Sequence, residues 1–391
     1  MNFKIPFAGR QHEYSDEEIE VVVNAMKFSV PLTQGSNLKL FQNEFCDYVN
    51  CRHAFGVSNA TAALEMAAQL LLINEGDEVI IPSHTYTSSA YPFLKQGAKI
   101  VWADIDLQTR VVNAETIKKC ITKNTKAIVV VHLYGFGADM EEILDLATEN
   151  DLILIEDVAQ ALGGELNSKK LGTFGHLGVF SFHSHKNIST LGEGGMLITD
   201  DENFAKVIPL LRHNGHCDFE FSRDQYWLPA MGNVDMPTLH NSYLWPNNYC
   251  LGEVECALGT KMLQRIDAIN SEKRRRAIHF INELSNYPEL QFHVEDSPRH
   301  AYHLLVAMVT DIDRDDFIKS MSNDYGIQCV VQYYPLDRYD LYKKADQGKS
   351  NCPKTDLFFD NMVSFPFQHS LAMAELDYIL EATKKVVEKL R

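Results

Sequence analysis

Residues 181–195 read SFHSHKNISTLGEGG and place a lysine, Lys186, between an apolar segment and a glycine-rich turn. The apolar segment predicts a strand, so the amine of Lys186 is expected to project from a rigid sheet edge into a cleft. An amine that is fixed in this way and partly desolvated can form a covalent bond with an aldehyde. A lysine taken alone is more often a solvated side chain, so this interpretation depends on its neighbours.

A second motif, LIEDVAQ at residues 154–160, ends an apolar strand in two adjacent carboxylates. Ligands of open α/β sheets bind at the carboxyl ends of the strands, which puts Asp157 where a cofactor would lie. A carboxylate against the ring nitrogen of pyridoxal phosphate (PLP) keeps that nitrogen protonated and makes the ring a stronger electron sink. An aspartate before a helical segment is also a common N-cap, and the motif by itself leaves both interpretations open.

Residues 57–64, VSNATAAL, predict a strand that runs through small polar residues into a helix. The backbone N–H groups of Ala60 and Thr61, the Thr61 hydroxyl and the helix dipole together make an anion site that suits a phosphate. Capping of the helix by Asn59 or the serine before it explains the same residues. In the motif PSHTYTSSA, Tyr86 is placed to lie flat on a cofactor ring, although an aromatic residue after a strand is more often part of the core.

The segments that must position these residues follow a βαβ pattern between about residues 54 and 200. Short apolar runs alternate with stretches of helical period, which predicts a mainly parallel seven-stranded sheet flanked by helices. The predicted strands are residues 55–58, 78–82, 99–104, 127–132, 152–156, 178–182 and 196–199.

The remaining chain lacks this rhythm. Residues 213–247 contain aromatics, glycine and prolines without a clear period, which predicts a long ordered loop. Residues 253–284 have helical spacing, residues 303–309 predict a strand, and the chain ends in a helix. The expected fold class is therefore α/β, with a large domain at residues 1–247 and a smaller α+β domain at residues 248–391.

Composition limits the function further. The chain has 36 basic and 53 acidic residues, a net charge of −17, and no cluster of Lys and Arg, so nucleic acid is not an expected partner. The eight cysteines are scattered without zinc-site spacing, and no metal is expected. The N-terminus turns polar too soon for a signal peptide and no apolar run is long enough to span a membrane, so a cytoplasmic enzyme is expected.

Together the motifs resemble the sugar aminotransferases of the DegT/StrS type, within the fold-type I PLP enzymes of the aspartate aminotransferase superfamily. The similarity runs in order along nearly the whole chain. Its segments are IPF near the start, GDEVIIPSHTY, HLYG, IEDVAQALGG, SFHSHKN followed by GEGG, NNY, YYP and SFPFQHSL.

The resemblance implies the central chemistry of the site. Lys186 would bind PLP covalently, Asp157 would pair with the ring nitrogen, and Gln160 would reach the ring hydroxyl. Once displaced by the amino donor, Lys186 would move a proton between the donor and the cofactor, so a second dedicated base is not required.

The resemblance also implies how the cofactor is held. Ala60, Thr61 and Ser181 would bind the phosphate, and Tyr86 would stack on the ring. Asn248 would reach the phosphate in the neighbouring subunit's site, which implies a homodimer with composite active sites.

The implied reaction moves an amino group, in this family usually from glutamate, to a keto sugar, such as a nucleotide-linked keto-deoxysugar of surface-polysaccharide or natural-product biosynthesis. A ketocyclitol or a small keto phosphate would suit the same cofactor site. Related PLP-dependent sugar dehydratases carry a histidine in place of the lysine, and His185 precedes Lys186, but the spacing from Ser181 puts Lys186 at the covalent position. A PLP-fold regulatory protein without turnover is a further alternative, and the intact Lys186 and Asp157 argue against it.

Four positions depart from the family pattern. Cys250 stands where an arginine usually follows the Asn-Tyr pair, Asp337 where a histidine follows Tyr-Pro, and His176 where an aspartate follows glycine. Ala60 replaces a glycine but still has the backbone N–H that a phosphate needs. These departures, with the loop at residues 213–247, are expected to bear on the identity of the keto substrate.

Overall fold

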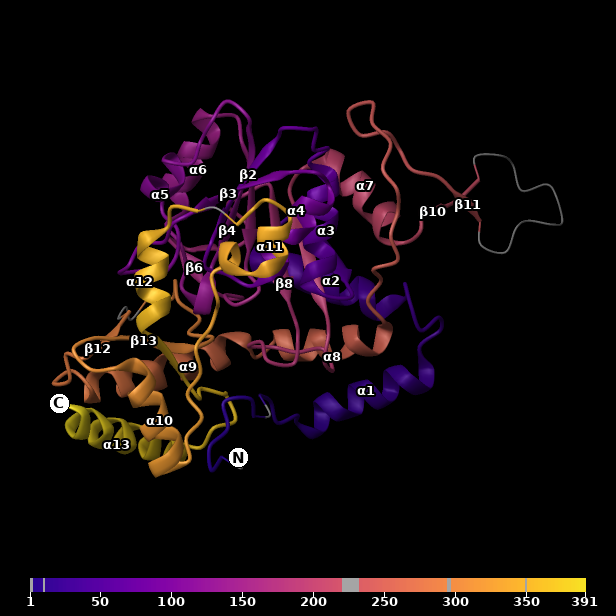
Figure 1. Ribbon diagram of the computed structural model, residues 1–391. Helices are drawn as coiled ribbons and strands as arrows, with labels where there is room; N and C mark the ends of the chain where they lie inside the picture. The colour runs from indigo at the N-terminus through magenta and orange to yellow at the C-terminus, as the bar shows by residue number, and fades with distance from the viewer. Residues whose placement is uncertain (1–2, 10, 220–231, 294–296, 349) are drawn as a thin grey trace.

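The computed structural model describes residues 3–9, 11–219, 232–293, 297–348 and 350–391. Its centre is a seven-stranded sheet in the order β1-β9-β8-β5-β4-β2-β3, flanked by helices (Figure 1). The strands are β1 (His53–Val57), β2 (Glu78–Pro82), β3 (Lys99–Ala103), β4 (Thr125–Val131), β5 (Ile153–Asp157), β8 (Leu177–Ser181) and β9 (Gly195–Thr199). The expected α/β class with a mainly parallel sheet is confirmed.

The strand directions follow from how the strands are connected. Strands β2, β3, β4, β5 and β8 run parallel to one another, whereas β9 is antiparallel to both of its neighbours, β1 and β8. No helix separates β8 from β9, so the chain turns back along the preceding strand. All residues of β2, β8 and β9 are buried, as expected for strands covered on both faces.

Most helices of the first 212 residues connect these strands. The helices are α1 (Asp16–Phe28), α2 (Ser36–Val49), α3 (Ala60–Leu70), α4 (Tyr91–Lys95), α5 (Ala114–Lys118), α6 (Met140–Glu149) and α7 (Glu202–Arg212). Helix α3 begins almost directly after β1 and packs against β8 and β9. Its N-terminus therefore lies beside the carboxyl end of β8, where the cofactor is expected to bind.

The C-terminal part contains a second, smaller sheet, as expected. Strands β12 (Leu290–Phe292), β13 (Leu305–Val309) and β14 (Met362–Phe365) are antiparallel, with β13 in the middle. The helices around it are α9 (Ile266–Glu283), α10 (Arg314–Tyr325), α12 (Pro353–Asn361) and α13 (Met373–Leu390). The short α11 (Asp340–Lys344) lies apart, with its Tyr342 ring against the Trp102 ring of β3. The predicted strand at residues 303–309 and the predicted final helix are both present. The division of the chain at residues 247 and 248 stays a prediction.

The helical spacing at residues 253–284 corresponds to two helices, α8 (Glu253–Leu263) and α9. The chain bends at Arg265, which has φ −113° and ψ 5°, although neither glycine nor proline marks the bend. Helix α8 packs against α1 and α2, and α1 and α8 lie side by side in Figure 1. The bend sends α9 away from these helices, toward the small sheet.

Within the loop predicted at residues 213–247, residues 220–231 lie outside the described residues. Two short strands flank this gap, β10 (His216–Cys217) and β11 (Asn233–Val234), and they pair antiparallel. The pair projects from the body of the molecule in Figure 1. Among the described residues, no helix combines the length and apolar character that crossing a bilayer requires.

Candidate active site

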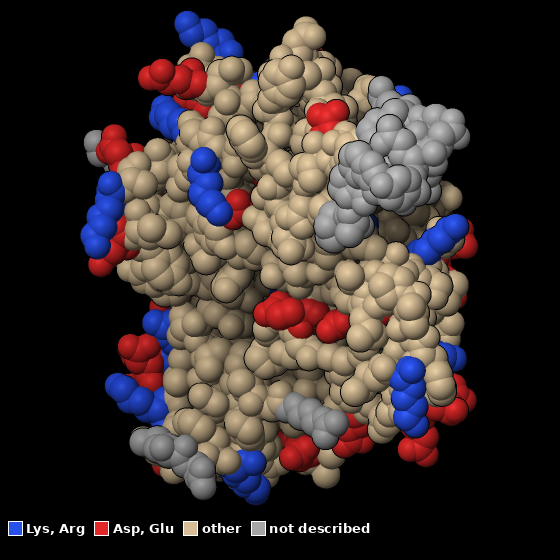
Figure 2. Space-filling model, turned by 90° about the vertical axis from the view of Figure 1, so that its right-hand side faces the viewer, with Lys and Arg blue, Asp and Glu red and all other residues tan. Residues whose placement is uncertain are grey.

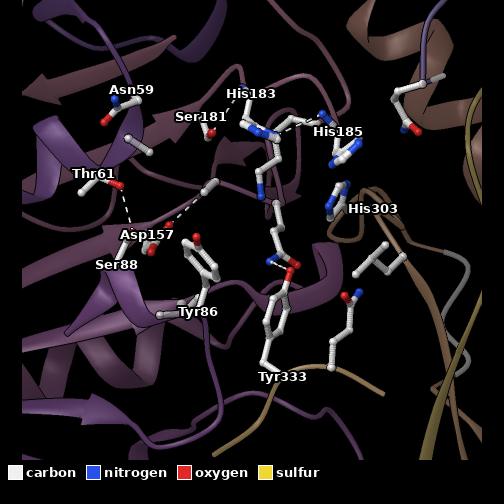
Figure 3. Close-up of a pocket in the computed structure, with 18 of the residues that line it drawn as sticks. Asn59, Thr61, Tyr86, Ser88, Asp157, Ser181, His183, His185, His303 and Tyr333 are labelled. Atoms are coloured by element: carbon white, nitrogen blue, oxygen red, sulfur yellow. Dashed lines mark hydrogen bonds between the residues drawn. The ribbon is translucent and has the colours of Figure 1, made fainter. Parts of the chain in front are cut away.

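A pocket of about 590 Å³ lies where β1, β2, β5 and β8 end (Figure 3). Of the residues expected to contact the cofactor, those lining this pocket are Ala60, Thr61, Tyr86, Asp157, Gln160, Ser181 and Lys186. They come from separate segments of the chain and meet because parallel strands end at one edge of the sheet. Asn248 is not among the described residues that line it.

Asp157 is the last residue of β5, and only 5% of it is exposed. Its carboxylate accepts hydrogen bonds from the Ser89 hydroxyl at 2.8 Å and from the Ala159 backbone N–H at 3.1 Å. Burial raises the pKa of Asp157, and these hydrogen bonds and the charge of Lys186 oppose the rise. A buried carboxylate of this kind favours a cationic partner, and a protonated ring nitrogen supplies one.

The adjacent carboxylate, Glu156, points away from this pocket because side chains alternate along a strand. It accepts hydrogen bonds of 2.7 Å from the backbone N–H groups of Gly172, Phe174 and Gly175, and its other contact is His132 at 3.2 Å. Glu156 therefore holds the loop before β8 in place. Of the two carboxylates in the motif, only Asp157 is available to a ligand.

Lys186 is half-buried, and its backbone is fixed on both sides. Its N–H donates to the His183 carbonyl at 2.8 Å, and its carbonyl accepts from the His12 ring at 2.8 Å. Burial lowers the pKa of the Lys186 amine to about 8, and the Asp157 carboxylate opposes this shift. About a tenth of the amine is therefore neutral at pH 7, and bond formation with an aldehyde requires this neutral form.

The two interpretations of the VSNATAAL motif are compatible. The Asn59 side chain caps α3 by accepting from the Ala62 backbone N–H at 2.9 Å. The N–H groups of Ala60 and Thr61 belong to the first turn of the helix and have no acceptor within it. The cap and an anion therefore use different N–H groups of the same helix N-terminus.

Two serines and one glycine complete the surroundings of this helix N-terminus. The Thr61 hydroxyl donates to the Ser88 hydroxyl at 2.9 Å, which leaves the proton of Ser88 for another acceptor. Ser181 is the last residue of β8 and is buried. A Cβ atom on Gly195 would lie 2.6 Å from the Asn59 carbonyl carbon, so the GEGG glycine lets β9 pass close to the start of α3.

Gln160 and Tyr86 both contact Tyr333, which lines the same pocket. The Gln160 carbonyl oxygen accepts from the Tyr134 backbone N–H at 2.7 Å, and its amide nitrogen donates to the Tyr333 hydroxyl at 3.1 Å. Tyr86 is 55% exposed, and its ring meets the Tyr333 ring edge-on with centroids 6.0 Å apart. The exposed ring of Tyr86 is thus part of the pocket wall and not of the core.

These features fit PLP. The pocket offers a helix N-terminus with hydroxyl groups for a phosphate, a buried carboxylate for a ring nitrogen, and a lysine amine for an aldehyde. The individual contacts of these residues with PLP stay predictions.

The pocket also contains residues beyond the expected cofactor contacts. His183, His185, His303 and Tyr333 line it, together with Ser88. His183 and His185 belong to the lysine motif, and Tyr333 belongs to YYP, so their motifs were visible although their positions in the pocket were not. His303 belongs to no such motif, because it lies just before β13, far along the chain from the lysine motif.

Two of the departures from the family pattern lie in the protein framework. Neither His176 nor Asp337 is among the described residues that line the pocket. The His176 ring accepts from the Leu154 backbone N–H at 3.0 Å, near the end of β5 that is opposite Asp157. Asp337 is buried and accepts from the Ser350 hydroxyl at 2.7 Å. Neither residue therefore lines the pocket of its own chain, and a bearing of these two residues on the substrate stays a prediction.

Asn248 and Cys250 lie on the segment that follows α7. Asn248 pairs with His213 in an isolated antiparallel bridge, and the Cys250 thiol contacts the Arg212 carbonyl at 3.8 Å. Neither lines the pocket of its own chain among the described residues. The expected contact of Asn248 with a neighbouring subunit's phosphate stays a prediction.

Comparison with known proteins agrees with this geometry. Residues 13–384 match the model of the DegT/DnrJ/EryC1/StrS aminotransferase family. The chain is 31% identical to GDP-perosamine synthase of Vibrio cholerae over 338 residues, which covers 85% of this chain and 86% of the relative. It is 30% identical to the spore coat polysaccharide biosynthesis protein SpsC of Bacillus subtilis, covering 99% of this chain and 97% of the relative.

A solved structure shows the same fold. The GDP-4-keto-6-deoxy-D-mannose-3-dehydratase of Escherichia coli with bound hydrated PLP superposes with a TM-score of 0.84 at 23% identity, over 98% of this chain and all of that chain. This chain therefore belongs to the DegT/DnrJ/EryC1/StrS aminotransferase family, and it is an enzyme of the PLP-dependent sugar aminotransferase type.

Proposed function

We propose that the enzyme moves an amino group from L-glutamate to a keto-deoxysugar carried on a nucleotide, in the cytoplasm, for surface-polysaccharide or natural-product sugar biosynthesis. The observation that carries this proposal is the meeting of the Lys186 amine and the Asp157 carboxylate in one pocket beside an anion site. The names of the relatives support the acceptor class, because one makes a GDP-linked sugar and another serves polysaccharide synthesis.

The chain's own residues have distinct tasks in this reaction. PLP supplies, when bound, a ring that withdraws electrons from the carbon that carries the nitrogen. Asp157 would hold the ring nitrogen protonated, and the N-terminus of α3 would orient the phosphate. The Lys186 amine, with its pKa lowered to about 8, would take a proton from the amino donor's α-carbon and return it on the other side of the transfer.

The rival sugar dehydratase activity requires a different residue at the covalent position. The fold does not separate the two activities, because the Escherichia coli dehydratase shares it. Here both His185 and Lys186 line the pocket, but His185 is exposed, whereas Lys186 is half-buried and electrostatically coupled to Asp157. This difference favours transamination. A ketocyclitol or small keto phosphate as acceptor would leave the same residues in the same roles.

We also propose a homodimer whose active sites combine residues of both chains. Phe28, Val30 and Leu32 are 73%, 94% and 56% exposed, in a segment at the right of Figure 1, and Trp245 is 84% exposed. Uncharged surface covers much of the face shown in Figure 2, with acidic side chains at its centre. Exposed apolar residues in such number favour burial against another copy of the chain.

The test of the proposed reaction uses its two halves separately. Holoenzyme mixed with L-glutamate alone should lose the absorbance of bound PLP, and GDP-4-keto-6-deoxy-D-mannose should then restore it and yield an aminated sugar detected by mass spectrometry. Retention of the PLP absorbance with L-glutamate would contradict the donor. Release of a dehydrated sugar without nitrogen would contradict the reaction class.

Covalent attachment is tested independently of both substrates. Borohydride reduction of the holoenzyme should fix the cofactor on the peptide that contains Lys186. Lys186→Ala should abolish this product and the glutamate half-reaction, whereas Lys206→Ala, on α7, should change neither. A reduced cofactor found on the Lys186→Ala protein would refute the role of Lys186.

A further inference from the structure

Tyr333 lies in the pocket on a segment that is anchored from several sides. The carbonyl of the preceding residue, Gln332, accepts from the Tyr134 hydroxyl at 2.6 Å. Val330 exchanges backbone hydrogen bonds of 3.0 and 2.8 Å with Ser364 of β14. The rings of Tyr333 and Tyr134 are stacked with centroids 6.3 Å apart. The position of the Tyr333 hydroxyl is therefore set by the fold and not by a free loop.

The hydrogen bonds of Gln160 show that the Tyr333 proton is not donated to Gln160. A backbone N–H can only donate, so the bond from Tyr134 identifies the side-chain oxygen of Gln160 as the atom facing it. The Gln160 amide nitrogen then donates to the Tyr333 hydroxyl oxygen. Because that oxygen already accepts, its own proton is free for a different acceptor. Among the described residues, Gln160 is its one hydrogen-bond partner, and the pocket provides the remaining space.

The Tyr333 hydroxyl is a donor at neutral pH. Burial raises the pKa of Tyr333 to about 12, and the hydrogen bond from Gln160 opposes this rise. The Gln160 amide nitrogen, which carries a second N–H, lies 3.1 Å from the Tyr333 hydroxyl oxygen, and both residues line the pocket. In Figure 3 the Tyr333 ring points toward the middle of the pocket, and a dashed line marks the hydrogen bond at its hydroxyl. Two neighbouring donors of this kind suit one oxygen atom that carries negative charge.

We propose that Tyr333 is a further cofactor-contacting residue, whose hydroxyl donates a hydrogen bond to the oxygen on the PLP ring beside Gln160. This assignment rests on the PLP dependence of the family and does not depend on which amino donor or keto sugar is used. The hydroxyl would stabilise negative charge on that oxygen and so lower the pH at which the cofactor bound to Lys186 loses its proton.

The first test is a pH titration of the holoenzyme followed by cofactor absorbance. Tyr333→Phe keeps the ring and removes only the donor, so the absorbance transition should move to higher pH by about one unit, the size of one hydrogen bond to a charged group. Tyr334→Phe is the matched control, because Tyr334 contacts Tyr339 and Phe359 and does not line the pocket among the described residues. An unchanged transition in Tyr333→Phe, or an equal shift in both variants, would overturn the proposal.

A second test compares the affinity of the apoenzyme for PLP and for 3-deoxypyridoxal phosphate, which lacks the ring oxygen. Wild type should prefer PLP, and Tyr333→Phe should reduce that preference about tenfold while binding the analogue as wild type does. Tyr334→Phe should keep the full preference. Because each protein serves as its own reference, a general loss of stability changes both affinities and not their ratio. A ratio that is unchanged in Tyr333→Phe would refute the contact.

Discussion

Two adjacent carboxylates at the end of β5 have different tasks because they occupy opposite faces of one strand. Asp157 faces the pocket and accepts two hydrogen bonds, whereas Glu156 is saturated by three backbone N–H groups and His132. Both are carboxylates, so the functional group alone does not distinguish their tasks. What distinguishes them is which hydrogen-bond donors surround each carboxylate. Replacing each one by its amide should therefore affect a different property of the protein.

Asp157→Asn should leave the protein folded and lower turnover by about two orders of magnitude or more, because a neutral amide does not hold the ring nitrogen protonated. Glu156→Gln should instead lower the free energy of unfolding by about 2–4 kcal/mol, since its NH₂ group would face backbone donors. Steady-state kinetics and urea denaturation of both variants check the contrast. Near wild-type turnover in Asp157→Asn would exclude its proposed role.

The lowered pKa of Lys186 predicts how cofactor capture depends on pH. The neutral amine reacts with the aldehyde, and with a pKa of about 8 its fraction rises with pH up to that value and then levels off. The rate at which apoenzyme combines with PLP should therefore fall about tenfold per unit below pH 8 and become constant above it. Stopped-flow absorbance measures this rate. A rate that keeps rising up to pH 10 would show that the Lys186 amine has an ordinary pKa.

At the scale of elements, the site depends on helix termini that are satisfied from elsewhere in the chain. Helix α3 is capped by Asn59, whereas α2 is preceded by Gly35 and has no side-chain cap of its own. The carboxylate of Glu253, the first residue of α8, accepts from the backbone N–H groups of Gly35, Asn37 and Leu38 at 2.8 to 3.1 Å. A residue some 215 positions away therefore caps α2 and fixes α8 against it.

Glu253→Gln should lower the free energy of unfolding by about 2–4 kcal/mol, because it removes a buried charge from three N–H donors and turns an NH₂ group toward them. Glu255→Gln is the matched control on the same helical turn, since Glu255 is only half-buried and is expected to change stability by less than about 1 kcal/mol. Urea denaturation followed by circular dichroism compares the two. Equal losses would argue against capping by Glu253.

At the scale of the whole molecule, the pocket is built by segments from nearly the full length of the chain. Phe7 and Gln368 both line it, although they are close to opposite ends of the sequence. Asn248 is the one expected cofactor contact that lies elsewhere. The proposed homodimer would bring it to the neighbouring chain's phosphate, and subunit mixing tests that arrangement.

Lys186→Ala and Asn248→Trp should each be inactive, the second because a bulky ring would block the phosphate site of the partner. Mixed in equal amounts and allowed to exchange, they should regain about a quarter of wild-type activity, because half of the dimers are mixed and each has one intact site. Sites built from one chain would regain none. A fully active monomer in sedimentation analysis would rule out the arrangement whatever the mixing showed.

The sequence by itself determined the strands, the fold class and the family. Apolar runs at β2, β4, β5 and β8 are local signals, because a strand buried on both faces needs apolar side chains throughout its length. The positions of Lys186 and Asp157 relative to their strands follow from the same local pattern. The family motifs then gave these residues their expected roles.

Only the tertiary structure decided which side chains share the pocket and which do not. His303 and Tyr333 enter it from the C-terminal part, His176 lies at the far end of β5, and Glu156 turns away from it. The bend between α8 and α9 likewise has no glycine or proline to announce it. These features depend on contacts between residues that are far apart in the chain. A local sequence pattern predicts periodicity and capping, but it does not predict which distant residues a side chain will contact.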